Sequence, residues 1–411
     1  MGMKINFPHP LITSVGLLSI FFVFGALPCT AALGAHEEKL ADANNYFAFN
    51  LLKQIAHDQA GTNIFISPYS VSAVLDMIEN GAVGETKKEM DRVLGISGLG
   101  AESLNEACKG LDAAIRSAGT NVTLTLANSI WYRPSIQLRP EFSALNENYF
   151  HAALNMLDFT DPRAAGNINK WVEENTGGKI KKIIDPPIPG SFQVFLANAI
   201  YFKGTWLSQF DTRQTKQRLF HLGNAGTKPV SLMQQKGRFS YQESDQFQAI
   251  RLPYKGARLG MFVLLPQTNS TPEKILTDLD AAKWKNAMLP KFTSREGTIA
   301  LPRFKVEYGV QLKPALQALG MKLPFSQNAD FSKMSSTSLY LDEVKQKSYV
   351  EVNEEGTEAA AVTIGGMKAT AVHAPTKPFE MIVDRPFILL IEDNLTKTLL
   401  FLGIIVDPPS G

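Results

Sequence analysis

The chain has 411 residues, of which 45% are hydrophobic and 19% charged, and its formal net charge is +2. This composition is typical of a soluble globular protein; it is neither basic enough to indicate nucleic-acid binding nor acidic enough to indicate disorder. The sequence shows no repeat period and no low-complexity block, which argues against solenoids and propellers.

The N-terminal segment, residues 1–35, has the features of a secretory signal peptide. Lys4 precedes an uncharged apolar run over residues 11–27, and small residues follow. An uncleaved membrane anchor is the alternative, although the run is close to the shortest that spans a bilayer. Cleavage after Ala32 and cleavage after Ala35 both fit the small-residue exit. We therefore expect a secreted protein, extracellular or, in a bacterial host, periplasmic.

The two cysteines argue against a disulfide framework. Cys29 leaves with the signal peptide, so the mature chain keeps Cys108 alone. Leu104, Leu111 and Ile115 recur with Cys108 at helical spacing, which predicts a thiol on a buried helix face; a reactive nucleophile is the alternative. Stability must then come from a large core.

Hydrophobic periodicity predicts the elements in chain order. A helix is expected over residues 40–56, and a second over 70–79 after the start signal Ser67–Pro68. A third helix ends at the glycine pair Gly177–Gly178. Strands are predicted within the segments 121–132, 192–204, 261–266, 298–308 and 347–356, and a hydrophobic hairpin with its turn at 394–395 ends the chain.

The order of these elements indicates the fold class. Helices dominate the first third and strands most of the rest, without regular alternation, which predicts an α+β fold with large mixed or antiparallel sheets. No Pro-, Gly- or Ser-rich linker divides the chain. One domain over residues 36–411 is therefore expected after the signal peptide.

The sequence lacks the motifs of common enzyme classes. It contains no G-x-S-x-G, H-E-x-x-H, phosphate-binding G-x-x-x-x-G-K or G-x-G-x-x-G pattern. Its six histidines are scattered and join no cysteine cluster at metal-ligand spacing. We predict that the protein is not an enzyme and uses no metal and no cofactor.

Six blocks of the sequence span residues 63–75, 198–206, 252–266, 301–321, 329–334 and 384–408. Each of these blocks resembles part of the serpin family, and they occur in family order over nearly all of the mature chain. The resemblance implies three β-sheets, eight or nine helices and an exposed reactive-centre loop at about residues 354–380. It also implies a suicide-substrate inhibitor of serine proteases, with cysteine proteases as a second target class, whose loop is cut and then inserts into the central sheet, trapping the acyl-enzyme.

The start of this loop favours the inhibitory type. Thr357, Ala359, Ala361 and Thr363 share one face of an extended strand, and all are small enough to enter a sheet without overpacking. Gly356 allows the unusual backbone angles of a hinge. A non-inhibitory carrier, storage protein or chaperone is the alternative, but such members tend to carry a charged or bulky residue here. By resemblance the hinge comprises Glu354, Glu355, Gly356, Thr357, Glu358, Ala359, Ala360 and Ala361.

The resemblance also assigns residues that control insertion. Ser67, Ser70 and Asn198 are similar to the polar cluster beneath the sheet, called the shutter. A histidine usual in that cluster is replaced by Gln346, which forms hydrogen bonds but cannot take a positive charge. Ordinary core and surface packing is the alternative for each of these residues, and also for those of the breach. At the breach, where insertion begins, the resemblance assigns Trp206, Thr215 and an acid–base pair of Glu354 with Arg303.

The family's hinge-to-cut spacing places the reactive bond at Thr370–Ala371. A threonine flanked by alanines fits elastase-like or subtilisin-like proteases. Because the loop is longer than in familiar members, cleavage after Lys368, which needs a trypsin-like pocket, stays open, as does cleavage after Ala371 or Val372.

The expected partner is the target serine protease, in a covalent acyl-enzyme complex with a monomeric inhibitor. Nucleic acid is not expected. The segment 102–116 offers only Lys109 and Arg116 as bases, so no strong heparin site is predicted. The N-x-[ST] sites at Asn121, Asn269 and Asn394 would matter only in a glycosylating host.

Overall fold

The computed structural model describes residues 1–2, 33–118, 122–223, 226–357 and 377–410. It divides into two units, Met1–Ala32 and Leu33–Gly411. Most of the predicted signal peptide, including Cys29, falls outside the described residues, and so does Asn121. Within the described ranges no helix is both long and apolar enough to cross a membrane. All the helices and strands of the described residues belong to the second unit.

Helices fill the first third of this unit, as the periodicity predicts. The first helix, α1 (Ala35–Asp58), begins five residues before the expected start at Leu40. In α2 (Pro68–Glu79), Ser67 caps the first turn by accepting a hydrogen bond from the Ser70 amide, and Pro68 takes the first helical position. The other α-helices among the described residues are α3 (Gly84–Leu94), α4 (Ala101–Arg116), α5 (Pro140–Phe150), α6 (Ala164–Asn175), α7 (Pro272–Asp278), α8 (Ala281–Lys283) and α9 (Lys313–Ala318).

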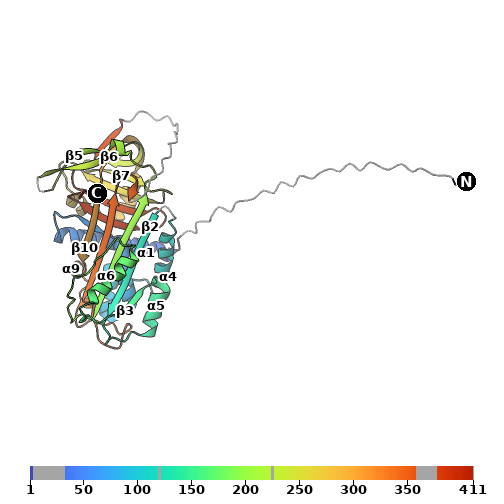
Figure 1. The fold of residues 1–411 in the computed structure, drawn as a ribbon, viewed down its shortest axis with the longest axis vertical. Helices are drawn as coiled ribbons and strands as arrows, with labels where there is room; N and C mark the ends of the chain where they lie inside the picture. The colour runs from blue at the N-terminus through green and yellow to red at the C-terminus, as the bar shows by residue number, and fades with distance from the viewer. Residues whose placement is uncertain (3–32, 119–121, 224–225, 358–376, 411) are drawn as a thin grey trace. The chain divides into compact units, whose positions relative to one another are not determined.

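A six-stranded sheet runs beside these helices. Its order is β10-β11-β4-β2-β3, with β12 also paired to β4, and α6 lies in front of it in Figure 1. Strand β4 (Val194–Thr205) is buried along almost its whole length because both faces of the sheet are covered, which explains its unbroken apolar run. The other strands are β2 (Val122–Tyr132), β3 (Ala153–Met156), β10 (Phe304–Gln311), β11 (Glu343–Val352) and β12 (Gly356–Thr357).

A nine-stranded network holds the remaining strands, in the order β1-β15-β14-β8-β7-β6-β9-β13 with β5 beside β6. The three sheets implied by the family resemblance thus form two hydrogen-bonded networks here. The reason is the 17-residue strand β6 (Thr227–Glu243), which pairs with β5 at its start, β9 along its middle and β7 at its end. The others are β1 (Ile64–Ile66), β5 (Lys216–His221), β7 (Phe247–Pro253), β8 (Leu259–Pro266), β9 (Thr293–Pro302), β13 (Phe379–Ile382), β14 (Phe387–Asp393) and β15 (Leu399–Ile405).

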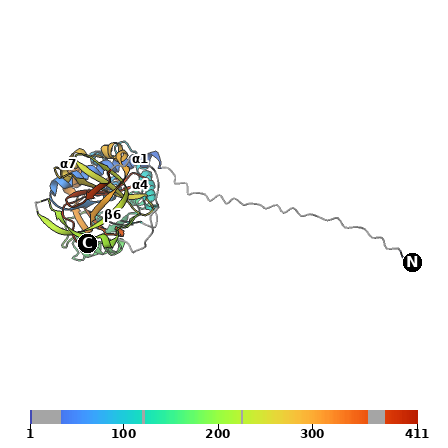
Figure 2. The same ribbon diagram turned by 90° about the horizontal axis from the view of Figure 1, so that it is seen from above.

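The core is divided by β4 into two apolar clusters. Leu196, Ile200 and Phe202 join the large cluster that also contains α1 and α2. The intervening Ala197 and Tyr201 face a smaller cluster beneath α6. The period of two along a strand produces this division. Seen from above in Figure 2, α1 and α7 lie on the side opposite β6.

Candidate functional site

A strand of only two residues, β12, pairs with the end of β4. Strands β4 and β11 are parallel neighbours, paired from Phe195↔Glu343 to Tyr201↔Tyr349. Beyond this ladder β4 continues, and β12 pairs with it antiparallel, with Thr357 opposite Gly204. The chain leaving β11 has therefore already turned back along β4. If the β4–β11 ladder opened, a longer β12 could run antiparallel to both strands and pair with each.

A tight turn makes this reversal. Asn353 and Gly356 exchange both backbone hydrogen bonds, at 2.8 and 3.2 Å. The Asn353 side-chain oxygen also accepts from the backbone amides of Glu355 (3.1 Å) and Gly356 (3.2 Å), as in other asparagine-initiated turns. The indole of Trp206 donates to the Asn353 carbonyl at 2.9 Å, which fixes the turn to the end of β4.

Gly356 and Thr357 are packed into the sheet. Gly356 has φ = 151°, and any Cβ at this position would collide with the carbonyl oxygen of Gly204, so only glycine fits. Thr357 is fully buried, and its hydroxyl lies 2.9 Å from the phenol oxygen of Tyr254. The Tyr254 ring stacks on Trp206 at 4.7 Å. These contacts hold the first inward-facing hinge residue inside the sheet.

Two side chains interact with the carboxylate of Glu354, one at hydrogen-bond distance and the other farther away. The Thr215 hydroxyl donates to its Oε1 at 2.6 Å. Arg303 approaches its Oε2 only to 3.9 Å, and the Arg303 side chain is 43% exposed. The structure thus brings together all the residues predicted for the breach, with Thr215 as the closer partner.

The residues predicted for the shutter also meet, beneath the β4–β11 ladder. Gln346 lies directly opposite Asn198 in this ladder and donates from Nε2 to the Asn198 Oδ1. The Gln346 side chain also exchanges two hydrogen bonds with the Ser67 backbone, at 2.9 and 3.0 Å. Asn198 donates in turn to the Ser70 carbonyl at 3.0 Å. All four residues are buried, and the hydrogen bonds among them involve no ionisable side chain.

Three further residues of this site were not identified from the sequence. Tyr254 binds the Thr357 hydroxyl, Asn353 makes the turn, and Asn128 of β2 accepts through Oδ1 from Asn198 and Ser70. An Asn three residues before a glycine, as in Asn353 and Gly356, is a turn signal by which Asn353 could have been identified from the sequence. Tyr254 and Asn128 lie on distant segments, and their positions depend on sheet pairing.

The remaining predicted site residues cannot be placed. The following predicted hinge and reactive-bond residues lie outside the described residues: Glu358, Ala359, Ala360, Ala361, Lys368, Thr370 and Ala371.

Of the possible glycosylation sites, Asn269 and Asn394 are exposed. Cys108 is a free, partly buried thiol, and burial with the neighbouring Asp76 raises its pKa well above the usual value. This argues against the nucleophile alternative, because the thiolate is the reactive form.

The sequence and the fold both match known proteins. Residues 42–408 match the family described as serpin (serine protease inhibitor). The chain is 37% identical over 382 residues to the leukocyte elastase inhibitor of Bos taurus, covering 90% of this chain and 100% of that one. It is 37% identical to iripin-3 of Ixodes ricinus, covering 89% and 94%. The crystal structure of native protease nexin-1 with heparin superposes with a TM-score of 0.82 at 28% identity, covering 90% and 100%.

Proposed function

The chain belongs to the serpin family of serine protease inhibitors, and we propose that it is an inhibitory member that traps its protease by inserting the segment after Thr357 as a new strand. One observation carries this proposal. Strand β12 already pairs with β4, and Thr357 is already buried, at the end of the β4–β11 ladder where the new strand would continue.

Continuing the register of β12 tests the fit of the loop sequence. Thr357 pairs with Gly204, so Ala359 would lie opposite Phe202, Ala361 opposite Ile200 and Thr363 opposite Asn198. Residues directly opposite each other share a face of the sheet, and this face is the one that packs on the large core. Small side chains on that face let the sheet close over the new strand.

The same register places charge on the other face. Glu358 would lie opposite Lys203, which is half-buried, so the carboxylate would meet an opposite charge. Both faces of the strand after Thr357 are therefore compatible with insertion beside β4.

Inhibition would proceed by a race between insertion and hydrolysis. The protease serine attacks the carbonyl carbon of Thr370, the bond to the Ala371 nitrogen breaks, and the amine leaves with a proton. The serine is then esterified to the new C-terminus. Insertion separates Gln346 from Asn198 and draws the ester away from its site. If insertion is faster than deacylation, the acyl-enzyme persists.

The target is an elastase-like or subtilisin-like protease, because Thr370 and its alanine neighbours suit a small primary pocket. The similarity to a bovine protein named leukocyte elastase inhibitor agrees with this choice. We place the protein outside the cell, on the basis of the signal-like segment at residues 1–35. Heparin activation is not proposed, since Arg116 on α4 is already paired with Asp112 at 2.6 Å.

A protease panel tests the proposal. The mature chain is incubated with pancreatic elastase, subtilisin and trypsin, and a denaturing gel is examined for a complex that survives boiling. Mass spectrometry of the released C-terminal peptide identifies the cut bond. A stable complex with elastase or subtilisin and a peptide beginning at Ala371 is expected. Cleavage without any complex would assign the chain to the non-inhibitory serpins. A complex with trypsin and a peptide beginning at Ala369 would move the reactive residue to Lys368.

A further inference from the structure

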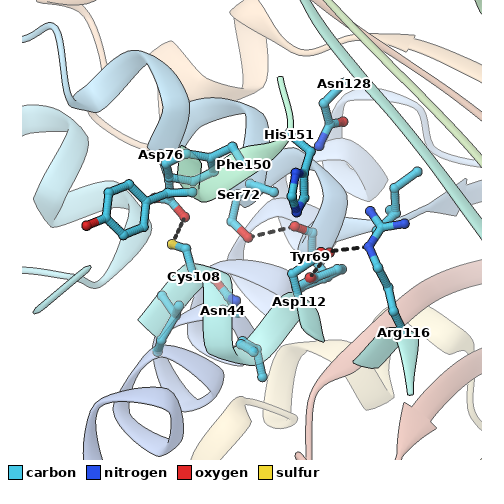
Figure 3. Close-up of a pocket in the computed structure, with 15 residues that line it drawn as sticks. Asn44, Tyr69, Ser72, Asp76, Cys108, Asp112, Arg116, Asn128, Phe150 and His151 are labelled. Carbon is cyan, nitrogen blue, oxygen red and sulfur yellow. Dashed lines mark hydrogen bonds and ion pairs between the residues drawn. The ribbon is translucent and has the colours of Figure 1, made fainter. Parts of the chain in front are cut away.

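A cavity of about 300 Å³ lies between α1, α2, α4, the end of α5 and the middle of β2, and none of the hinge residues lines it. Figure 3 shows Asp76, Cys108, Asp112, Arg116 and His151 around it. Most of the remaining wall is apolar or aromatic. The apolar and aromatic residues that line it include Leu40, Tyr69, Leu111, Leu126, Tyr149 and Phe150.

One acidic group in this wall has an unused oxygen. Asp76 is only 2% exposed, and the Cys108 thiol donates to its Oδ2 at 3.6 Å. Its Oδ1 is buried and has no hydrogen-bond partner in the described part of the chain. A buried carboxylate oxygen without a partner carries a desolvation cost that a bound donor would remove.

The other charges of the cavity are already paired. The Arg116 Nε bonds the Asp112 Oδ2 at 2.6 Å, and the Tyr69 hydroxyl donates to the Asp112 Oδ1 at 3.1 Å. Arg116 is thus not free to receive an anion. Asp76 alone lacks a counter-ion in the wall, so the cavity favours a cation.

We propose that this cavity binds a small organic cation, a primary amine joined to one apolar ring, with its ammonium group on Asp76. The ring would pack on Leu126, Phe150 and the neighbouring apolar residues. An organic cation is favoured over a metal ion because no group of three or more His, Cys, Asp or Glu side chains in the described ranges is arranged to hold one.

Binding should depend on pH through Asp76. Burial raises the pKa of Asp76 to about 7, so its carboxyl gains a proton between pH 8 and pH 6, while an alkylamine stays charged. The charged and titratable groups around it are Cys108, Asp112 and Arg116 on α4, Lys87 and Asp91 on α3, and Tyr69, His151 and Tyr149 in the cavity wall. Lys87 is paired with Asp91 at 3.0 Å and with the buried carboxylate of Glu79 on α2.

Isothermal titration of the intact chain without protease tests the proposal, so its result is independent of inhibition. The probe is 2-phenylethylamine, and 2-phenylethanol is its neutral analogue of equal size. At pH 8 the amine is expected to bind with Kd on the order of 0.1–1 mM and the alcohol at least about tenfold more weakly. Lowering the pH to 6 should weaken amine binding about tenfold. No amine binding at millimolar concentration, or equal binding of amine and alcohol, would overturn the proposal.

Variants distinguish the contribution of the Asp76 carboxylate to binding from that of the cavity as a whole. Asp76→Asn should remove the preference for the amine over the alcohol and abolish the pH dependence, which also isolates any contribution of His151. Glu102→Gln neutralises an exposed acid on α4 that does not line the cavity, and should leave amine affinity unchanged. If Asp76→Asn does not fold, Ala73→Phe, which fills the cavity, should abolish binding of both probes; retained amine affinity in either variant rejects this site.

Discussion

At the residue scale, Thr357 decides whether the hinge can enter the sheet. Its side chain is fully buried against Tyr254. Thr357→Arg would place a guanidinium there without a partner, at a cost of several kcal/mol. Insertion should slow and the variant should become a substrate, cleaved with at least tenfold less stable complex. The ratio of complex to cleaved chain on a gel measures this. Thr227→Arg, at an exposed strand position, is the matched control; equal ratios for both variants would rule out insertion at Thr357.

Glu354 offers a second residue-scale comparison. The Thr215 hydroxyl binds its carboxylate at 2.6 Å within a half-buried contact, whereas the Arg303 guanidinium lies 3.9 Å away and its side chain is 43% exposed. Hydrogen bonds to charged groups contribute about 1.5–3 kcal/mol, and exposed ion pairs about 0–1 kcal/mol. Thr215→Ala should therefore lower the thermal midpoint by several degrees and Arg303→Ala by about one degree or less. The reverse order in calorimetry would make the ion pair the dominant contact.

The buried carboxyl of Glu392 makes the free energy of unfolding depend on pH in a defined direction. It is buried beneath Trp284, whose indole donates to it at 2.7 Å, and burial raises its pKa to about 7. The nearby charges of Lys397, Arg251 and Asp393 act on it more weakly. Between the unfolded pKa of about 4.3 and pH 7 the native state binds more protons, so this group lowers the free energy of unfolding as pH rises.

Glu392→Gln should remove that loss. The variant keeps an acceptor for Trp284, so its thermal midpoint should exceed that of the wild type by several degrees at pH 8 and by much less at pH 5. Glu380→Gln, at an exposed position of β13, should show no such difference. A wild-type midpoint above that of Glu392→Gln at pH 8 would contradict the buried-acid interpretation.

At the element scale, the β4–β11 ladder holds the six-stranded sheet together, and it is also where the proposed new strand would insert. Gln346 joins its two strands to each other and to the start of α2. Gln346→Leu keeps the volume but leaves the Ser67 amide and the Asn198 oxygen without that partner, each costing about 1–3 kcal/mol. The thermal midpoint should fall by roughly 5 °C. Gln217→Leu, at an exposed position of β5, is the control and should change it little. An unchanged midpoint for Gln346→Leu would show that the ladder does not depend on this cluster.

At the scale of the whole molecule, the proposed function requires a native state that is kinetically trapped, because a strand that could pair on both sides is absent from the sheet. Cleavage between residues 367 and 372 should release the loop to insert beyond Thr357. The thermal midpoint should then rise by tens of degrees, as expected for one added, fully paired strand. Scanning calorimetry before and after limited proteolysis measures it. A clean cut that leaves the midpoint unchanged would favour the non-inhibitory alternative.

The sequence alone was sufficient to predict the α+β class, because helical periodicity and strand alternation are local properties. It also located the N-terminal cap at Ser67, the glycine stop after α6 and the terminal hairpin. The resemblance of ordered blocks gave the serpin fold. The strand prediction over 298–308 was less complete, since the chain crosses at Arg303 from β9 in one network to β10 in the other, and a crossing between sheets leaves no local pattern.

Only the tertiary structure decided which distant side chains meet. Tyr254 reaches Thr357 and Asn128 joins Ser70 and Asn198 because strand pairing brings together segments more than fifty residues apart. Strand pairing also decides the burial of Thr357 beside β4. The local sequence is compatible either with an exposed hinge or with the first residues of a strand. The unpartnered carboxylate of Asp76 likewise emerged from packing: helical spacing places a residue on a face, but the neighbouring elements determine whether a charge there finds a partner.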